Sequence, residues 1–264
     1  MKVLVLYGRS SVAAPSRAVE SFRVERGGHG GPPVQDWLGS EFMSGDTPHV
    51  PSEWDPEPRW PAWIAILAVG LLYSALPRYL IIGPRWLFMV ILLVLMLPII
   101  ITHFRDHHLL NRVFGLSVTG VVTLGLMASV ILLIRALPEH LQSPTELLLS
   151  AGSLWLTNIL VFAIWYWRLD AGGPHGRDQR PGHSEGAFLF PQMTLPPETP
   201  SAANPNQWSP NFVDYLFLAF NTSTAFSPTD VPVLARWAKG LMMLQSLISL
   251  TVIALLAARA VNIL

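Results

Sequence analysis

The chain has 264 residues, of which 51% are hydrophobic and only 13% are charged. Soluble domains carry roughly a quarter charged residues, and the deficit here is concentrated in long uncharged runs, so the sequence predicts an integral membrane protein. We expect its fold to be all-α. The formal net charge is zero, which gives no indication of nucleic-acid binding. The absence of cysteine excludes disulfides, thiolate metal sites and cysteine nucleophiles.

Residues 1–58 differ in character from the rest of the chain. They hold scattered charges with glycine and proline clusters, and they contain no apolar run long enough to span a bilayer. The opening MKVLVLYG is too short for the core of a signal peptide. We therefore predict a largely disordered N-terminal segment, and Met43 is a candidate for the true start of translation.

Five later segments have the ~20 mostly apolar residues that a membrane-crossing helix needs. The first three form a peripheral group within residues 59–146, and the last two belong to a segment that covers 147–264. Tryptophans lie near several segment ends, as is typical of a membrane interface. The predicted spans are 61–82, 86–104, 113–134, 147–167 and 240–258, the last extended at both ends to 233–263.

A shorter helix is predicted between the last two spans. The connection 169–210 is polar and rich in glycine and proline, which is typical of an extramembrane loop. After it, Asn211 is a candidate helix start, and Asp214 lies in the first turn, where the helix dipole favours a carboxylate. The helix 211–222 is too short to cross a bilayer.

The residues after this helix predict a re-entrant pore loop. The stretch 223–230 is rich in serine and threonine and ends in an aspartate. Non-helical backbone is tolerated at membrane depth where it lines a water-filled cavity. We therefore predict a two-helix pore module, with an outer helix at 147–168, a filter-like strand at 223–230 and an inner helix at 233–263.

This order resembles the pore of tetrameric potassium channels, which is similar to D-A-L-Y-F-S-x-x-T-x-T-T-V-G-Y-G-D. Asp214 matches the first aspartate, Thr222-Ser223-Thr224 matches T-x-T, and 225–230 falls on the remainder without a gap. The resemblance implies a homotetramer with a central pore for monovalent cations. From about residue 59 onwards, the chain also resembles a group of uncharacterised bacterial inner-membrane proteins, which implies that location. The stretches that carry this second resemblance are 155–167, 188–193 and 212–264.

The filter departs from the potassium-channel pattern at Ser227, Pro228 and Thr229, which replace G-Y-G. Proline fixes φ near −65°, and serine and threonine resist the positive φ that glycine accepts. Side-chain hydroxyls and a ring of Asp230 carboxylates would then select the ion, and such a ring favours cations. The predicted pore and filter residues are Thr222, Ser223, Thr224, Ala225, Phe226, Ser227, Pro228, Thr229 and Asp230.

Three of the polar residues within the apolar helices of the pore module are candidates for a pore lining or for a contact between helices. Gln245 and Ser249 are four residues apart and share a helix face. They either line the pore or make a contact between helices, and the sequence leaves both possibilities open. For Asn158, in the fourth span, we predict a hydrogen bond to another helix.

Two indicators of membrane orientation disagree. In potassium-channel topology the pore loop enters from outside, so five spans place the N-terminus outside. The positive-inside rule favours a cytoplasmic N-terminus, because the loops on that side hold twice as many cationic residues. These are Arg59, Arg105, Arg112, Arg168, Arg177, Arg180, Arg236 and Lys239, against Arg78, Arg85, Arg135 and Arg259.

The leading hypothesis is an oligomeric, cation-permeable pore whose partners are the lipid bilayer, further copies of the chain and monovalent cations. Two alternatives stay open. One is a non-conducting scaffold in which Phe226 and Pro228 plug the loop. The other is a small-solute transporter with a binding site in the broken segment 211–230. We predict no enzyme, cofactor or metal site, since no catalytic constellation is found and the adjacent His107 and His108 rarely chelate together on a helix.

Overall fold

The computed structural model describes residues 57–104, 108–136, 143–180, 182–183, 185–196, 208–224 and 231–261. Within these ranges the regular structure is helical, apart from one isolated bridge between Phe188 and Val233. The predicted all-α class is confirmed for this part of the chain. The segment predicted to be disordered lies outside the described residues, except for its last two positions, and the filter residues 225–230 lie outside them as well.

Six longer helices make up most of the described chain. They are α1 (Trp60–Ala75), α2 (Arg85–Phe104), α3 (His108–Ala136), α4 (Pro144–Leu169), α6 (Phe212–Thr224) and α7 (Arg236–Val261). The connections hold the short helix α5 (Pro174–Asp178) and 3₁₀ turns at Arg78–Leu80, Asp170–Gly172 and Pro191–Thr194.

Local sequence explains where several helices begin. The side chain of Ser143 accepts a hydrogen bond from the backbone N–H of Glu146 at 3.3 Å, and Pro144 occupies the first helical position of α4. Gly83 has a φ of +83°, which a side chain would disfavour, and it reverses the chain just before α2.

The first predicted span does not form one continuous helix. We expected a helix over 61–82, but α1 ends at Ala75, and a separate 3₁₀ turn follows at Arg78–Leu80. The cause is Pro77, because a proline restricts the preceding residue to extended backbone. Leu76 is accordingly extended, with a ψ of 149°.

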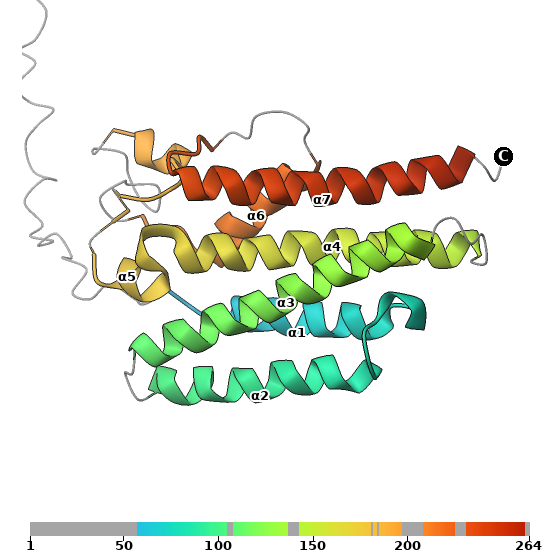
Figure 1. The fold of residues 1–264 in the computed structure, drawn as a ribbon. Coiled ribbons are helices and arrows are strands. Elements are labelled where there is room, and N and C mark those ends of the chain that lie inside the picture. The colour runs from blue at the N-terminus through green and yellow to red at the C-terminus, as the bar shows by residue number, and fades with distance from the viewer. Residues whose placement is uncertain are drawn as a thin grey trace, which may run out of the picture. The chain divides into compact units, whose positions relative to one another are not determined.

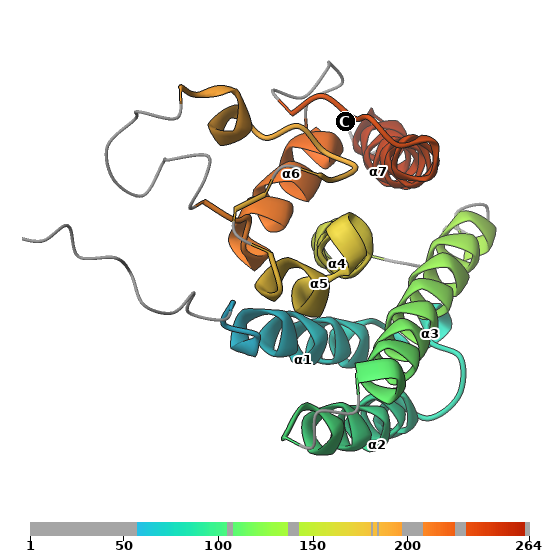
Figure 2. The ribbon, with the colours of Figure 1, turned by 90° about the vertical axis from the view of Figure 1, so that its left-hand side faces the viewer.

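Helix α4 lies at the centre of the bundle (Figures 1 and 2). Figure 2 shows it nearly end-on, with α1 and α3 on one side and α6 and α7 on the other. It contacts all four of these helices, while α2 packs on α1 and α3. The largest fully buried side chains of the described residues gather on and around α4, among them Phe162, Tyr166, Trp167, Phe188 and Tyr215.

Among the described residues, three helices are long and apolar enough to cross a membrane, as expected of a membrane protein. These segments are Leu110–Ala136, Thr145–Gly172 and Arg236–Ala258. The apolar helices Trp60–Ala75 and Arg85–Ile101 are shorter, so five spans stay a prediction. The three segments differ in how much of their most apolar part is buried inside the chain, 61% for the segment in α4 but only 22% for that in α7. Most of α7 is therefore free to contact lipid or another protein.

Candidate functional site

Helix α6 is half as long as its two neighbours. It has 13 residues, whereas α4 and α7 have 26 each. At 1.5 Å per residue these helices measure about 20 Å and about 39 Å. A helix of this length was predicted over 211–222, and the structure has it at Phe212–Thr224.

The start of α6 is closed by a reciprocal pair of hydrogen bonds. The Asn211 side chain accepts from the backbone N–H of Val213 at 2.8 Å, and the Asp214 carboxylate accepts from the backbone N–H of Asn211 at 2.8 Å. Such a reciprocal cap satisfies N–H groups that have no partner inside the helix. Asp214 thus lies in the first turn, as its predicted role at the helix start requires.

Helix α6 begins where α4 ends, and it stops midway along α4 and α7. We call the end of the bundle formed by Leu169, Phe212 and Arg236 the loop end. The Phe212 ring meets Trp167 there, with ring centroids 6.0 Å apart. At the other end of α6, Ser223 lies beside Asn158 and Gln245, which occupy the middle of α4 and α7.

Four buried polar residues join the three helices at this depth. We call Asn158, Ser223, Gln245 and Ser249 the polar seam; their exposed fractions are all 1% or less. The Gln245 amide donates to the Ala219 carbonyl and to the Ser223 hydroxyl, both at 2.7 Å.

The seam is completed from α4. The Tyr166 hydroxyl donates to Oε1 of Gln245 at 2.6 Å. The Asn158 amide donates to the backbone carbonyl of Gln245 at 3.1 Å and lies 3.5 Å from the Ser223 hydroxyl. The predicted interhelical hydrogen bond of Asn158 is therefore confirmed. Its Oδ1 is buried and has no hydrogen-bond partner among the described residues.

Side chains of α7 also cap the last turn of α6. The Ser249 hydroxyl donates to the Ser223 carbonyl at 2.7 Å, and the Ser246 hydroxyl lies 3.4 Å from the Thr222 carbonyl. The C-terminal carbonyls of a helix lack partners within it and carry partial negative charge. Donors from α7 thus satisfy much of the negative end of α6.

The predicted site residues fall into three groups. Gln245 and Ser249 are buried in the polar seam. Within one chain, they therefore make contacts between helices and do not line a pore. They do so because an amide or hydroxyl in apolar surroundings is costly unless it has a hydrogen-bond partner inside the protein. Thr222 and Ser223 are buried and Thr224 is half-buried at the end of α6. The remaining filter residues lie outside the described residues; they are Ala225, Phe226, Ser227, Pro228, Thr229 and Asp230.

A second polar network lies at the loop end, and the sequence did not predict it. Asp170 is fully buried, and its carboxylate accepts from the Tyr215 hydroxyl at 2.6 Å and from the backbone N–H of Ala187. His183 Nε2 lies 3.4 Å from the same carboxylate. Asp170 thereby ties the start of α6 and the loop after α5 to the end of α4.

Arg177 closes the end of α4 within this network. Its guanidinium donates to the carbonyls of Trp167 and Asp170 at 2.9 and 3.0 Å, and it pairs with Glu57 at 2.7 Å. Burial raises the pKa of the Glu57 carboxyl, and the attraction of Arg177 offsets only part of this rise. Glu57 and Arg177 are 120 positions apart, so no local pattern predicts their ion pair. The only visible signal was that Asp170 and Arg177 both follow the apolar run of α4 closely.

The loop also clamps the start of α7. The backbone N–H of Leu189 donates to the Pro232 carbonyl at 2.9 Å, and that of Leu234 donates to the Ala187 carbonyl at 2.8 Å. Phe188 lies beneath this bridge, fully buried against Tyr166 and Tyr215. The ends of α4, α6 and α7 are therefore held together by one loop.

Among the described residues, no three His, Asp or Glu side chains are grouped so as to hold a metal ion. His107 lies outside these residues. No family model matches the chain, and no curated protein or solved structure is significantly similar to it. Its function is therefore inferred from its own geometry.

Proposed function

We propose that the chain forms an oligomeric, cation-permeable pore in a membrane, with α4, α6 and α7 as the pore module of each copy. The observation that carries this proposal is that the half-length helix α6 ends midway along two helices long enough to cross a bilayer. In lipid, a helix that ends at such a depth leaves backbone groups that need protein or water as partners. Broken helices of this kind line ion and substrate pathways.

The chain length between α6 and α7 is compatible with a return strand. Thr224 ends α6, beside the polar seam, and Val231 lies next to Pro232, at the loop end. From Arg236 to Ser249 the rise along α7 is about 20 Å, and the backbone from Thr224 to Val231 can reach about 23–25 Å when extended. We propose that residues 225–230 form the narrow part, with the hydroxyls of Ser227 and Thr229 facing the ion and Asp230 at its mouth. The hydroxyls of Thr222 and Ser223, which the sequence also placed in the filter, are bonded inside the chain.

The pore needs several copies, because one chain supplies only one wall. Large apolar side chains on α6 and α7 are uncovered within the chain, including Phe217, Met243 and Leu247, which are 57%, 73% and 61% exposed. In an assembly these faces would meet lipid or the next copy. The resemblance to potassium channels favours four copies.

Charge favours a cytoplasmic loop end. Arg59, Arg177 and Arg236 lie at this end of the bundle, at the start of α1, in α5 and at the start of α7. By the positive-inside rule, the pore loop would then enter from the cytoplasm of a bacterial cell. Inverted entry is compatible with the physics, since the same backbone groups are satisfied in either direction.

A non-conducting scaffold is the second candidate, and the polar seam favours it. Gln245 and Ser249 have their hydrogen bonds inside the chain, and α7 satisfies carbonyls at the end of α6 that would otherwise face an ion. A pore can still form from the other face of the pore loop 223–230. The cation pore and the scaffold therefore differ in whether they conduct ions and not in their fold.

Flux measurements on reconstituted full-length protein separate the two candidates. We expect cation flux above that of empty liposomes, and we expect Asp230→Asn to lower both the flux and the preference for cations over anions. Glu185→Gln is the matched control, since this carboxylate is 83% exposed in the loop and should not affect conduction. A folded oligomer that passes no more cations than empty liposomes would support the scaffold and refute the pore.

A further inference from the structure

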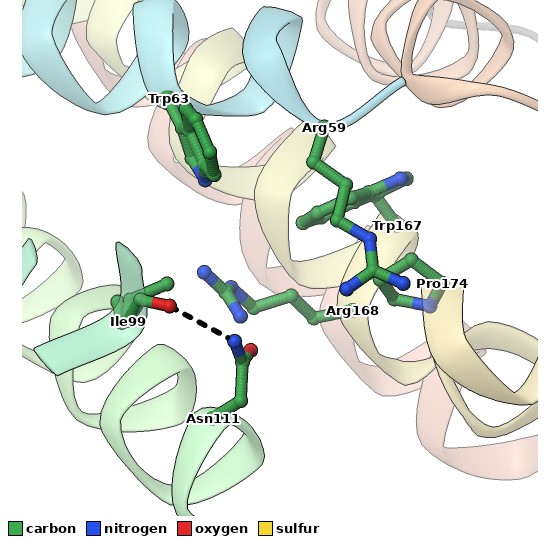
Figure 3. Close-up of a pocket in the computed structure, with 7 residues that line it drawn as sticks. All are labelled: Arg59, Trp63, Ile99, Asn111, Trp167, Arg168 and Pro174. Atoms are coloured by element: carbon green, nitrogen blue, oxygen red, sulfur yellow. Dashed lines mark hydrogen bonds between the residues drawn. The ribbon is translucent and has the colours of Figure 1, made fainter. Parts of the chain in front are cut away.

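A small cavity lies between α1, α2, α3, α4 and α5 (Figure 3), and none of the polar-seam residues lines it. Its volume is about 20 Å³, room for one water-sized group. The residues that carry the argument are Arg59, Trp63, Asn111, Trp167 and Arg168 (Figure 3). The cavity lies at the loop end of α4, near the ends of three other helices.

Arg168 is the unusual member of this cavity. Its Nε is buried and has no hydrogen-bond partner among the described residues. Two carboxylates near this end of α4 are already engaged, since Glu57 pairs with Arg177 at 2.7 Å and Asp178 with Arg59 at 2.8 Å. Within the described residues Arg168 therefore has no carboxylate partner, although burying an unpaired charge is costly.

The fold makes room for this guanidinium. A Cβ at Gly115 of α3 would lie 1.8 Å from Nη1 of Arg168, so any larger residue would displace the side chain. On the other side, the guanidinium carbon lies 5.4 Å from the centre of the Trp167 ring. Glycine and tryptophan thus hold a cation against the cavity that Asn111 and Arg59 also line.

The position of the cavity indicates what would neutralise this charge. Trp60 and Trp63, at the start of α1, are the kind of residue that gathers at the level of lipid headgroups. Basic pockets between membrane helices bind anionic headgroups, and a guanidinium matches the oxygens of a phosphate. The small volume admits one oxygen, while the rest of the phosphate stays outside.

We propose that this cavity binds one oxygen of an anionic phospholipid phosphate, with Arg168 as the main cationic contact and Arg59 as the second. The site lies between α4 and the three helices that precede it, away from α6 and α7, and does not depend on ion conduction. Free inorganic phosphate has the same chemistry, so the test includes it as a separate ligand.

The test uses full-length protein in phosphatidylcholine nanodiscs, with and without phosphatidylglycerol. Bound lipid is counted by native mass spectrometry, and thermal stability is followed with each lipid and with inorganic phosphate. We expect phosphatidylglycerol to be retained in preference to phosphatidylcholine. Removing one cationic contact near a membrane costs about 1 kcal/mol or more, so Arg168→Gln should weaken this preference about fivefold or more.

Two further variants make the result specific. Arg180→Gln removes an arginine whose side chain is 53% exposed and lies outside the cavity, and it should leave the lipid preference unchanged. Arg168→Lys keeps the charge but loses the planar set of guanidinium N–H donors, so it should give an intermediate preference. It also serves as the test variant if Arg168→Gln does not fold.

The outcomes are distinct. Retention of phosphatidylglycerol that depends on Arg168 supports a lipid source. Stabilisation by inorganic phosphate alone, with the same dependence, supports the phosphate site with a soluble source. The proposal is overturned if the wild-type protein neither retains phosphatidylglycerol preferentially nor is stabilised by inorganic phosphate. It is also overturned if the Arg168 variants keep the wild-type lipid preference, or if Arg180→Gln weakens that preference as much as Arg168→Gln does.

Discussion

Replacing Gln245 with leucine tests whether the polar seam holds α6 in place. Leucine has a similar size, but the change removes the hydrogen bonds to Ala219 and Ser223 and the one from Tyr166. Interhelical hydrogen bonds in membranes average about 0.6 kcal/mol, so three of them give about 2 kcal/mol. The Tyr166 hydroxyl, left buried without its acceptor, raises the loss to about 3–5 kcal/mol.

The measurement is the free energy of unfolding of the purified protein, followed by tryptophan fluorescence, with proteolysis of α6 as a local readout. Thr251→Val is the control, because this hydroxyl is only half-buried and donates only to the Leu247 carbonyl of its own helix. We expect the control to stay within about 0.5 kcal/mol of wild type. The reasoning is refuted if Gln245→Leu is as stable as Thr251→Val. A variant with altered conduction and unchanged stability would restore Gln245 to a pore lining.

Three other substitutions test separate parts of the fold, each by the same unfolding measurement. Tyr215→Phe removes one donor to the buried Asp170 carboxylate and should cost about 1–3 kcal/mol; no loss would mean that this contact does not anchor α6. Gly83→Ala places a side chain at a φ of +83°, where the nearest side-chain atom is 3.5 Å away, so backbone strain alone should cost about 1 kcal/mol or more. Ser143→Ala removes the cap of α4 and should cost about 1 kcal/mol, whereas Ser143→Asp, which keeps an acceptor, should cost little.

The sequence predicted those elements whose cause is local. The apolar run of 147–167 appears as α4, and the polar start at Asn211 with Asp214 appears as the cap of α6. A helix start or an apolar span depends on neighbouring residues, so its pattern is visible in a short window. The first predicted span, 61–82, is longer than the helix that forms, because its apolar composition extends beyond Pro77 whereas α1 ends at Ala75.

For contacts between distant residues, the sequence predicted the type of interaction but not which residue is the partner. Asn158 was expected to bond another helix, but nothing in its surroundings names Gln245, 87 positions later. Gln245 and Ser249 were correctly placed on one face of α7, yet periodicity does not distinguish a face turned to a pore from one turned to α6. The network around Asp170 depends on how the loop folds back, which no local pattern encodes.

The order of the polar partners along the chain has a consequence for membrane insertion. The groups that satisfy the end of α6 belong to α7, which leaves the ribosome after α6. Until α7 arrives, a short helix with unpaired carbonyls is unstable in hydrocarbon. We therefore expect α6 to wait at the membrane surface or within the insertion machinery and to enter together with α7, so a chain truncated before α7 would leave α6 accessible to the aqueous phase.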